Sequence, residues 1–127
     1  FSDGFVIGRV GASGSIQIIS TPIWATDNTL LLSIDSNIME KVYLFYYLQK
    51  CRLPQLATKT AQPLLTQKIL KSIDIAVPPF LEQKKIAGIL STVDEDIERE
   101  VDNKKKLETI KKGLMQVLLT GKKRVKV

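Results

Sequence analysis

Residues 77–97, VPPFLEQKKIAGILSTVDEDI, decide the fold of this chain, because the sequence pattern changes there to that of a long helix. Proline cannot donate to a strand ladder, so Pro78 and Pro79 end the element before them. Gly88 and Gly113 are the only glycines in the periodic pattern that follows, which holds no further proline. This pattern predicts a helix of about 40 residues, roughly 60 Å long.

Apolar residues along this predicted helix repeat with a four-three spacing, which is typical of helices that pair. Glu100, Lys104 and Lys111 occupy the intermediate positions of the repeat. A helix of this length cannot bury its apolar stripe against so small a domain, so we predict a partner helix. The predicted helix-pairing residues are Ile86, Leu90, Val93, Ile97, Leu107, Leu114 and Leu118.

Charges are sorted by sign along the same helix, with an acidic block at 94–102 and basic residues at 104–126. In a parallel pair of two copies the acidic block would face its own copy. In an antiparallel pair that crosses near Asn103, the acidic block of each helix would lie opposite the basic residues of the other. Each exposed ion pair contributes only about 0.2–1 kcal/mol, so the charges set the direction and the stripe supplies the affinity. The partner is a second copy or a similar segment of a longer chain; an unpaired, solvated helix is the simpler alternative.

The residues before the two prolines indicate a small mixed domain. A helix is predicted from near Asn37, with Glu40 three residues on, to residues 51–54, and a short amphipathic turn from near Thr66. The predicted fold class is α+β: a small mixed α/β domain followed by one long α-helix that pairs as an antiparallel coiled coil. Four β-rich runs predict strands at residues 5–10, 16–19, 30–34 and 73–77.

Length and composition exclude several classes of protein. With 127 residues the chain is long enough for one small core. It has no histidine and one cysteine, Cys51, so histidine-based triads, internal disulfides and multi-thiolate metal sites are excluded. The longest apolar run, 42–48, is far short of the roughly 20 residues that cross a bilayer, so we expect a soluble, intracellular protein. The chain starts at Phe1, within a strand-like run, so we expect it to be part of a longer protein.

Four motifs that could suggest chemistry are better explained without it. Residues 8–14, GRVGASG, lack the Gly-Lys-Ser/Thr ending of a phosphate-binding loop, and a strand-connecting turn is favoured. Residues 77–80, VPPF, resemble an amino-methyltransferase motif, but Val77 cannot hydrogen-bond a target amine. The acidic block spreads around a helix instead of converging on a cation, and Cys51 has no histidine as base. We therefore predict no catalytic residues and no metal site.

Binding is the remaining class of function. The net charge is +6, and residues 9–15 and 56–62 are rich in small hydroxyl, amide and basic side chains. Lys and Arg neutralise phosphates, Arg can read guanine and Gln adenine, and small residues let backbone amides approach a phosphate chain. Solvated connections are the alternative for both segments. The predicted DNA-binding residues are Arg9, Ser13, Ser15, Lys59, Thr60 and Gln62.

Motifs along the chain resemble the specificity subunit of type I restriction-modification enzymes. That family carries a strand, a Pro-Pro pair, then Glu-Gln and Ile-Ala at the start of a long helix, and a Leu-Thr-Gly-Lys finish. The matching helical segments are residues 77–87 (VPPFLEQKKIA), 89–94 (ILSTVD) and 113–122 (GLMQVLLTGK). Weaker matches to its target recognition domain are residues 4–7, 11–14, 25–28, 43–48 and 60–66.

The resemblance implies a non-catalytic subunit of a methyltransferase and endonuclease complex in the prokaryotic cytoplasm. Residues 1–79 would be the C-terminal portion of a domain that reads half of a bipartite DNA site, 80–121 a conserved spacer and dimerisation helix, and 122–127 a basic tail. The implied partners are double-stranded DNA, a modification subunit and a restriction subunit. These two subunits, and not this chain, would bind S-adenosylmethionine, ATP and Mg²⁺. A coiled-coil scaffold that binds protein and no DNA is the alternative function.

Overall fold

The computed structural model describes residues 3–126, so the predicted strand-like start at Phe1 lies outside the described residues. The chain divides into two compact units, Phe1–Gly88 and Ile89–Val127, and each is described by itself. The first unit extends beyond residue 79 and includes the opening turns of the long helix. Among the described residues, no helix combines the length and the apolar character that crossing a membrane requires.

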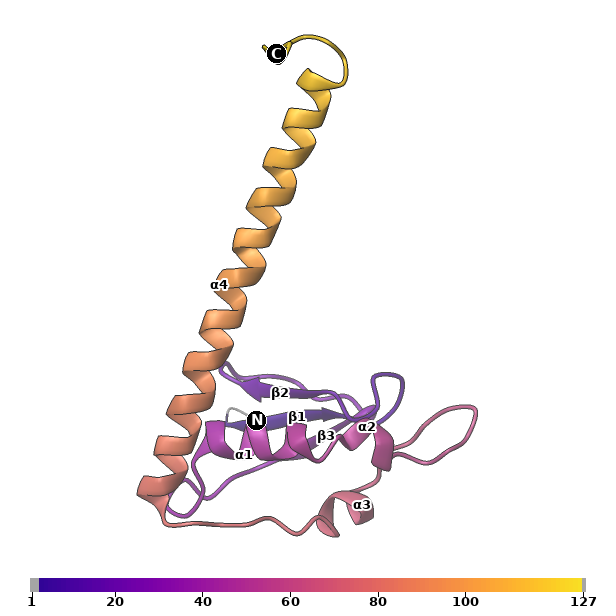
Figure 1. Ribbon diagram of the computed structural model, residues 1–127. Helices are drawn as coiled ribbons and strands as arrows, with labels where there is room; N and C mark the ends of the chain where they lie inside the picture. Colours follow the sequence, from indigo (N-terminus) through magenta and orange to yellow (C-terminus); the bar gives the residue numbers. More distant parts are fainter. Residues whose placement is uncertain (1–2, 127) are drawn as a thin grey trace. The chain divides into compact units, whose positions relative to one another are not determined.

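The first unit is built on a three-stranded antiparallel sheet (Figure 1). Its strands are β1 (Gly4–Gly8), β2 (Ile16–Ile19) and β3 (Thr29–Leu32), in the order β2-β1-β3. These three strands were predicted, with boundaries that differ by one or two residues. Phe5 on the central strand pairs with Ile18 on one side and Leu32 on the other. Phe5 and Ile7 are fully buried, because alternate residues of a strand point to the same face.

Three helices complete the core of this unit: α1 (Lys41–Lys50), α2 (Leu53–Leu56) and α3 (Gln67–Lys71). The predicted turn near Thr66 is confirmed as α3, whose first turn is capped by the Thr66 hydroxyl accepting the Ile69 N–H at 3.3 Å. The buried cluster of the core consists of Phe5, Ile7, Leu30, Leu44, Leu48, Leu53 and Leu65.

The first helix begins later than predicted. Its N-cap is Glu40, whose carboxylate accepts the Tyr43 N–H, and Asn37 does not cap it. Asn37 instead belongs to a local turn, where its backbone N–H and its side-chain amide both donate to Asp35 Oδ1 at 3.0 Å. Such side-chain turns compete with helix starts, which explains the shift.

The predicted strand at residues 73–77 was wrong. Ile73 and Ile75 do pack against the core, so the alternation of apolar residues is real, but the segment pairs with no described strand. Its carbonyls are satisfied by tyrosines of α1: the Tyr43 hydroxyl donates to Ala76 O at 2.8 Å and the Tyr47 hydroxyl to Asp74 O at 3.2 Å. Side-chain hydroxyls therefore replace a ladder partner here.

The predicted long helix is confirmed as α4 (Phe80–Leu118), which has 39 residues and no break. At 1.5 Å per residue it is about 58 Å long. The predicted stop at Thr120-Gly121 is also confirmed, because Gly121 adopts a left-handed φ of 72°. The Gly121 N–H donates to Leu118 O at 3.3 Å and the Lys123 N–H to Val117 O at 3.0 Å, which satisfies carbonyls at the end of the helix.

Candidate nucleic-acid interface

The connection between β1 and β2 is a tight turn held by its own backbone. The Gly8 N–H donates to Ser15 O at 2.9 Å, and the Gly14 N–H donates to Gly8 O at 2.8 Å. Gly14 has a φ of 83° and lies so close to the Leu53–Pro54 peptide that a Cβ would collide with it. The turn is therefore fixed to α2, and the side chains it carries have a defined position.

A second loop, residues 20–28 between β2 and β3, is tied to the same turn through Arg9. The Arg9 and Val10 N–H groups donate to Asn28 O at 2.9 and 3.4 Å, and Arg9 Nη1 donates to Asp27 O at 3.3 Å. The Arg9 side chain is nevertheless exposed. Because one bond leaves the other guanidinium N–H groups free to donate, Arg9 can still bind a phosphate or a base edge.

The third loop, residues 57–65, is joined to the first by an antiparallel bridge between Val10 and Leu64. The Leu65 N–H donates to Arg9 O at 3.0 Å, and the Thr58 N–H donates to Leu64 O at 3.0 Å. The two loops are thus joined at the base of the third, although about 50 residues of sequence separate them, and the rest of the third loop projects away from the turn (Figure 1).

The structure places five of the six predicted DNA-binding residues at the surface of these loops. Arg9, Ser15, Lys59, Thr60 and Gln62 are all exposed. The Thr60 hydroxyl donates to Gln62 O at 2.7 Å, so it shapes the loop and keeps acceptor capacity toward a ligand.

Ser13 is the exception among the six. Its hydroxyl is buried and has no hydrogen-bond partner among the described residues. Ser13 as a whole is half-buried, so its contact with DNA stays a prediction, and this conformation does not present its hydroxyl to a ligand.

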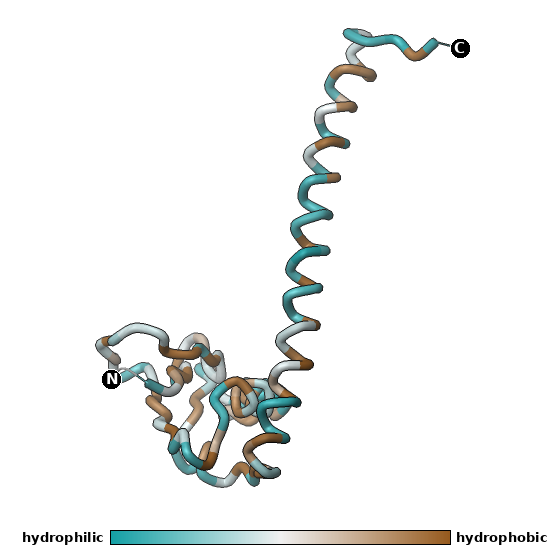
Figure 2. Tube along the Cα trace, turned by 90° about the vertical axis from the view of Figure 1, so that its left-hand side faces the viewer, coloured by the Kyte–Doolittle hydropathy of each residue, from teal (hydrophilic) through white to brown (hydrophobic). Residues whose placement is uncertain are grey.

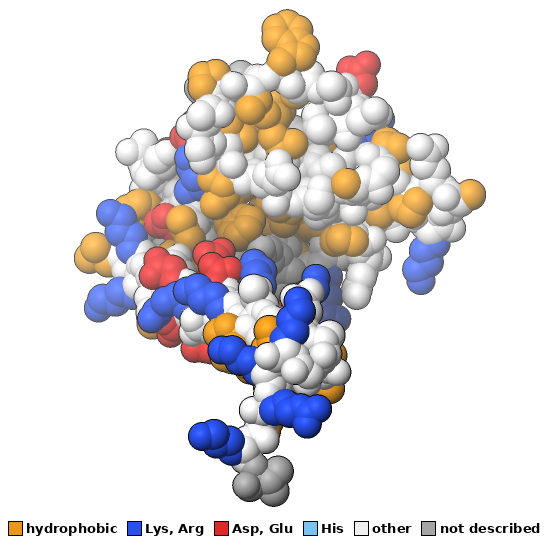
Figure 3. All heavy atoms as spheres, turned by 90° about the horizontal axis from the view of Figure 1, so that it is seen from above, with side chains coloured by type: hydrophobic (Ala, Val, Ile, Leu, Met, Phe, Trp, Pro, Cys, Tyr) orange, Lys and Arg blue, Asp and Glu red, His pale blue; other side chains and the backbone are white. Residues whose placement is uncertain are grey.

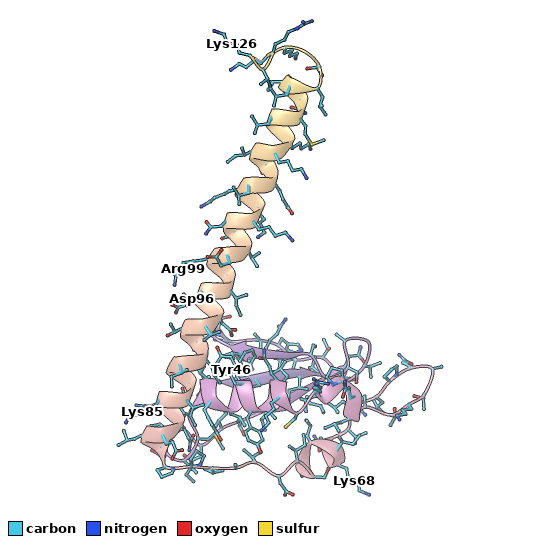
Figure 4. All side chains as sticks on the ribbon, in the orientation of Figure 1. Tyr46, Lys68, Lys85, Asp96, Arg99 and Lys126 are labelled. Carbon is cyan, nitrogen blue, oxygen red and sulfur yellow. The ribbon has the colours of Figure 1, made fainter. Side chains whose placement is uncertain are left out.

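Sequence reasoning missed a group of polar residues on α3. An open groove is lined by Arg9, Leu30, Thr66, Gln67 and Lys68, and the Lys68 side chain extends outward from α3 (Figure 4). We call residues 8–15, 20–28 and 57–68 the loop cluster. Its exposed cationic side chains are Arg9, Lys59 and Lys68, and its exposed carboxylate is that of Asp27. The helix is only five residues long, and no pattern in the sequence indicates that it borders Arg9.

The second candidate surface is the apolar stripe of α4. Leu107 is 65% exposed and Leu114 51%, whereas Ile86, in the first unit, is half-buried. Figure 2 shows apolar bands recurring between hydrophilic stretches along the helix. Two shallow apolar grooves follow the stripe, one beside Val93, Ile97 and Val101 and another beside Leu107, Ile110, Leu114 and Leu118. The predicted pairing residues of the second unit thus form two exposed apolar patches along one stripe of the helix.

Charged side chains flank this stripe and remain in solvent. Asp96 pairs with Arg99, Asp102 with Lys105 at 3.0 Å, and Lys104 with Glu108 at 3.9 Å. Figure 4 shows Asp96 and Arg99 on one side of α4, and Figure 3 shows basic side chains gathered around its C-terminal end. Exposed pairs of this kind are weak, so they remain available for pairing with another helix.

Comparisons with known proteins show to which family the chain is related. Residues 2–109 match the family described as the type I restriction modification DNA specificity domain. The type I restriction enzyme MjaVIII specificity subunit of Methanocaldococcus jannaschii is 39% identical over 125 residues, which cover 95% of this chain and 29% of that protein. A second protein of that organism, provisionally named the MjaX specificity subunit, is 43% identical over 101 residues, covering 76% of this chain and 24% of its own length.

A solved structure shares the fold. The crystal structure of a type I restriction-modification S subunit from M. genitalium superposes with a TM-score of 0.67 at 20% identity, over 92% of this chain and 32% of that one. The chain therefore spans about a quarter to a third of the length of these relatives. Because the family match extends over most of its residues, the chain belongs to the type I restriction modification DNA specificity domain family.

Proposed function

We propose that this chain supplies half-site DNA recognition in a type I specificity subunit. The bridge between Val10 and Leu64 carries the proposal, because it joins two polar loops that the sequence separates. The joined loops present Arg9 and Lys59, with Lys68 of α3 bordering Arg9. Cations beside amide and hydroxyl groups suit a DNA backbone and its base edges.

Binding to duplex DNA with salt titration tests this function. We expect a mobility shift at low salt that weakens steeply as salt rises, because each neutralised phosphate releases counterions. The absence of a shift at low salt would contradict the proposal. It would favour the alternative of a protein-binding scaffold, for which the exposed stripe of α4 is the supporting observation.

We further propose that α4 pairs antiparallel with a counterpart helix, here a second copy of the chain. The apolar stripe supports pairing, and the acidic block followed by the basic block supports the antiparallel direction. Leu90 and Leu114 are 37% and 51% exposed, so replacing both by Asp should leave the fold of the chain intact and abolish association.

Light scattering at low and high salt measures this association. The matched control replaces Thr109 and Gln116 by Asp, which adds the same charge at helix positions outside the stripe. We expect a dimer for the wild type and the control, and a monomer for the stripe variant. A wild-type monomer at both salt concentrations would contradict pairing between copies.

The remaining parts of the proposed function concern other subunits. A prokaryotic, cytoplasmic modification subunit and a restriction subunit would assemble on this chain and bind S-adenosylmethionine, ATP and Mg²⁺. The family match supports this assignment, in which this chain contributes recognition and pairing and the other subunits contribute catalysis. Pull-down of a purified modification subunit by the wild-type chain tests it.

A further inference from the structure

The side chain of Trp24 is an unexplained feature of the candidate interface. It is the only tryptophan of the chain, and it is 95% exposed. An indole ring is a large, mostly apolar surface, and exposing it to water is costly compared with burying it against a ligand. Within the fold it contributes nothing to the core cluster, so its position calls for a role outside the fold.

The backbone places Trp24 on the loop that is hydrogen-bonded to Arg9. It lies three positions before Asp27, whose carbonyl accepts a hydrogen bond from Arg9 Nη1 at 3.3 Å. Three residues of extended chain span at most about 11 Å, so the Trp24 and Asp27 Cα atoms are no farther apart than that. The Thr29 N–H donates to Thr26 O at 3.0 Å, which tightens the turn between Trp24 and β3. The indole therefore belongs to the loops that carry Arg9.

The neighbours of Trp24 indicate what kind of partner it meets. Pro22, Ile23 and Ala25 flank the indole in the sequence, and the other exposed side chains of the 20–28 loop, including Thr21, Thr26 and Asn28, are polar. The 20–28 loop is hydrogen-bonded to Arg9, and an exposed aromatic ring on a loop beside a cation is a combination that contacts nucleic acid, through base faces, sugars or the thymine methyl group.

We propose that Trp24 is a DNA-contacting residue, whose indole ring lies against the bases or sugars next to the phosphates that Arg9 and Lys59 hold. This proposal rests on the proposed DNA-binding function and adds a non-ionic contact to it. Because such a contact involves no counterion release, its contribution to affinity persists at salt concentrations that weaken the phosphate contacts.

The fluorescence of the single tryptophan tests the proposal directly. The probe is a duplex DNA library with a randomised core, added to the whole chain while a mobility shift is followed in parallel. We expect emission typical of a water-exposed indole without DNA, and quenching that follows the same DNA concentrations as the mobility shift. Trp24→Ala should weaken binding about tenfold, which corresponds to the loss of one aromatic contact, and Trp24→Phe should retain most of the affinity.

Leu81→Ala is the matched control, because Leu81 is 74% exposed and lies outside the loop cluster. It should leave the affinity unchanged. If DNA shifts the mobility but leaves the emission unchanged, and Trp24→Ala binds as tightly as the wild type, then Trp24 does not contact DNA. The DNA-binding function itself would remain supported. Emission typical of a buried indole before DNA is added, or quenching by a modification subunit in place of DNA, would assign Trp24 to a protein contact and overturn the proposal. The absence of any mobility shift would overturn both proposals.

Discussion

The side-chain carbonyl of Gln83 accepts the backbone N–H of Glu40 at 2.8 Å, which joins the first turn of α4 to the cap of α1. The amide of the same side chain donates to Ile38 O at 2.9 Å and to Pro78 O at 2.8 Å. Gln83 is fully buried, so each of its polar atoms has exchanged water for a backbone partner. This network explains why a Gln follows the Pro-Pro pair at the start of the helix.

Gln83→Leu should destabilise the first unit by about 2–4 kcal/mol, because it leaves three part-buried backbone groups without their partner. Urea unfolding followed by circular dichroism measures the loss. Lys85→Ala is the matched control, since Lys85 is exposed on the same turns of α4 and should change the stability little. Equal stability of the two variants would show that the Gln83 network adds nothing to the fold.

The two glycines of the β1–β2 turn give a second prediction. Gly11 and Gly14 have φ values of 78° and 83°, but a Cβ at Gly11 meets open space whereas a Cβ at Gly14 would lie 2.6 Å from Leu53 C. Gly11→Ala should therefore lower the stability by about 1 kcal/mol, through the strain of a left-handed backbone alone. Gly14→Ala should lower it by about 3 kcal/mol, because α2 must also move. Thermal unfolding of both variants checks the difference, and a Gly11→Ala variant as unstable as Gly14→Ala would contradict this reading of the turn.

The stability of the first unit at alkaline pH depends on the hydroxyl of Tyr43. Burial raises the pKa of Tyr43 above its ordinary value, and Tyr47 and Glu82 raise it further through repulsion of the phenolate. Because the folded-state pKa is raised, the stability it contributes is complete below the ordinary pKa near 10 and is lost as the pH rises through the folded value.

Tyr43→Phe should lower the stability by about 1 kcal/mol at neutral pH, through loss of the hydrogen bond to Ala76 O. It should also make the decline of stability above pH 10 shallower than in the wild type. Denaturant unfolding at neutral and alkaline pH measures both effects. Tyr47→Phe serves as the comparison, because the Tyr47 hydroxyl bonds the same segment at Asp74 O. An unchanged alkaline slope in Tyr43→Phe would contradict the prediction.

Local signals predicted the elements of this fold that depend on neighbouring residues. The Pro-Pro pair and the uninterrupted periodicity located α4, and the amphipathic pattern from near Thr66 located α3. The segment at 73–77 was mistaken for a strand because its alternation is correct, while its hydrogen bonds come from tyrosines about 30 residues away. No local pattern reveals whether an extended segment finds a strand or a side chain as its partner.

The candidate site shows the same limit. Composition selected both polar loops, but their meeting depends on the long-range bridge between Val10 and Leu64. Burial of the Ser13 hydroxyl and the exposure of Trp24 arise from how the loops fold back on the sheet, which residue type alone does not determine. Long-range packing therefore decides which members of a polar loop can reach a ligand.

The salt dependence of DNA binding distinguishes lysines that contact phosphates from lysines that remain in solvent. If Lys59 and Lys68 each neutralise one phosphate, replacing either by Gln should make the slope of log affinity against log salt shallower by about 0.9. Lys85→Gln, which removes the same charge from α4 outside the loop cluster, should lower affinity less and leave the slope unchanged. Fluorescence anisotropy of labelled duplex DNA across a salt series gives the slopes. If all three variants lose affinity equally with the wild-type slope, the effect belongs to net charge, and the loop cluster does not hold the phosphates.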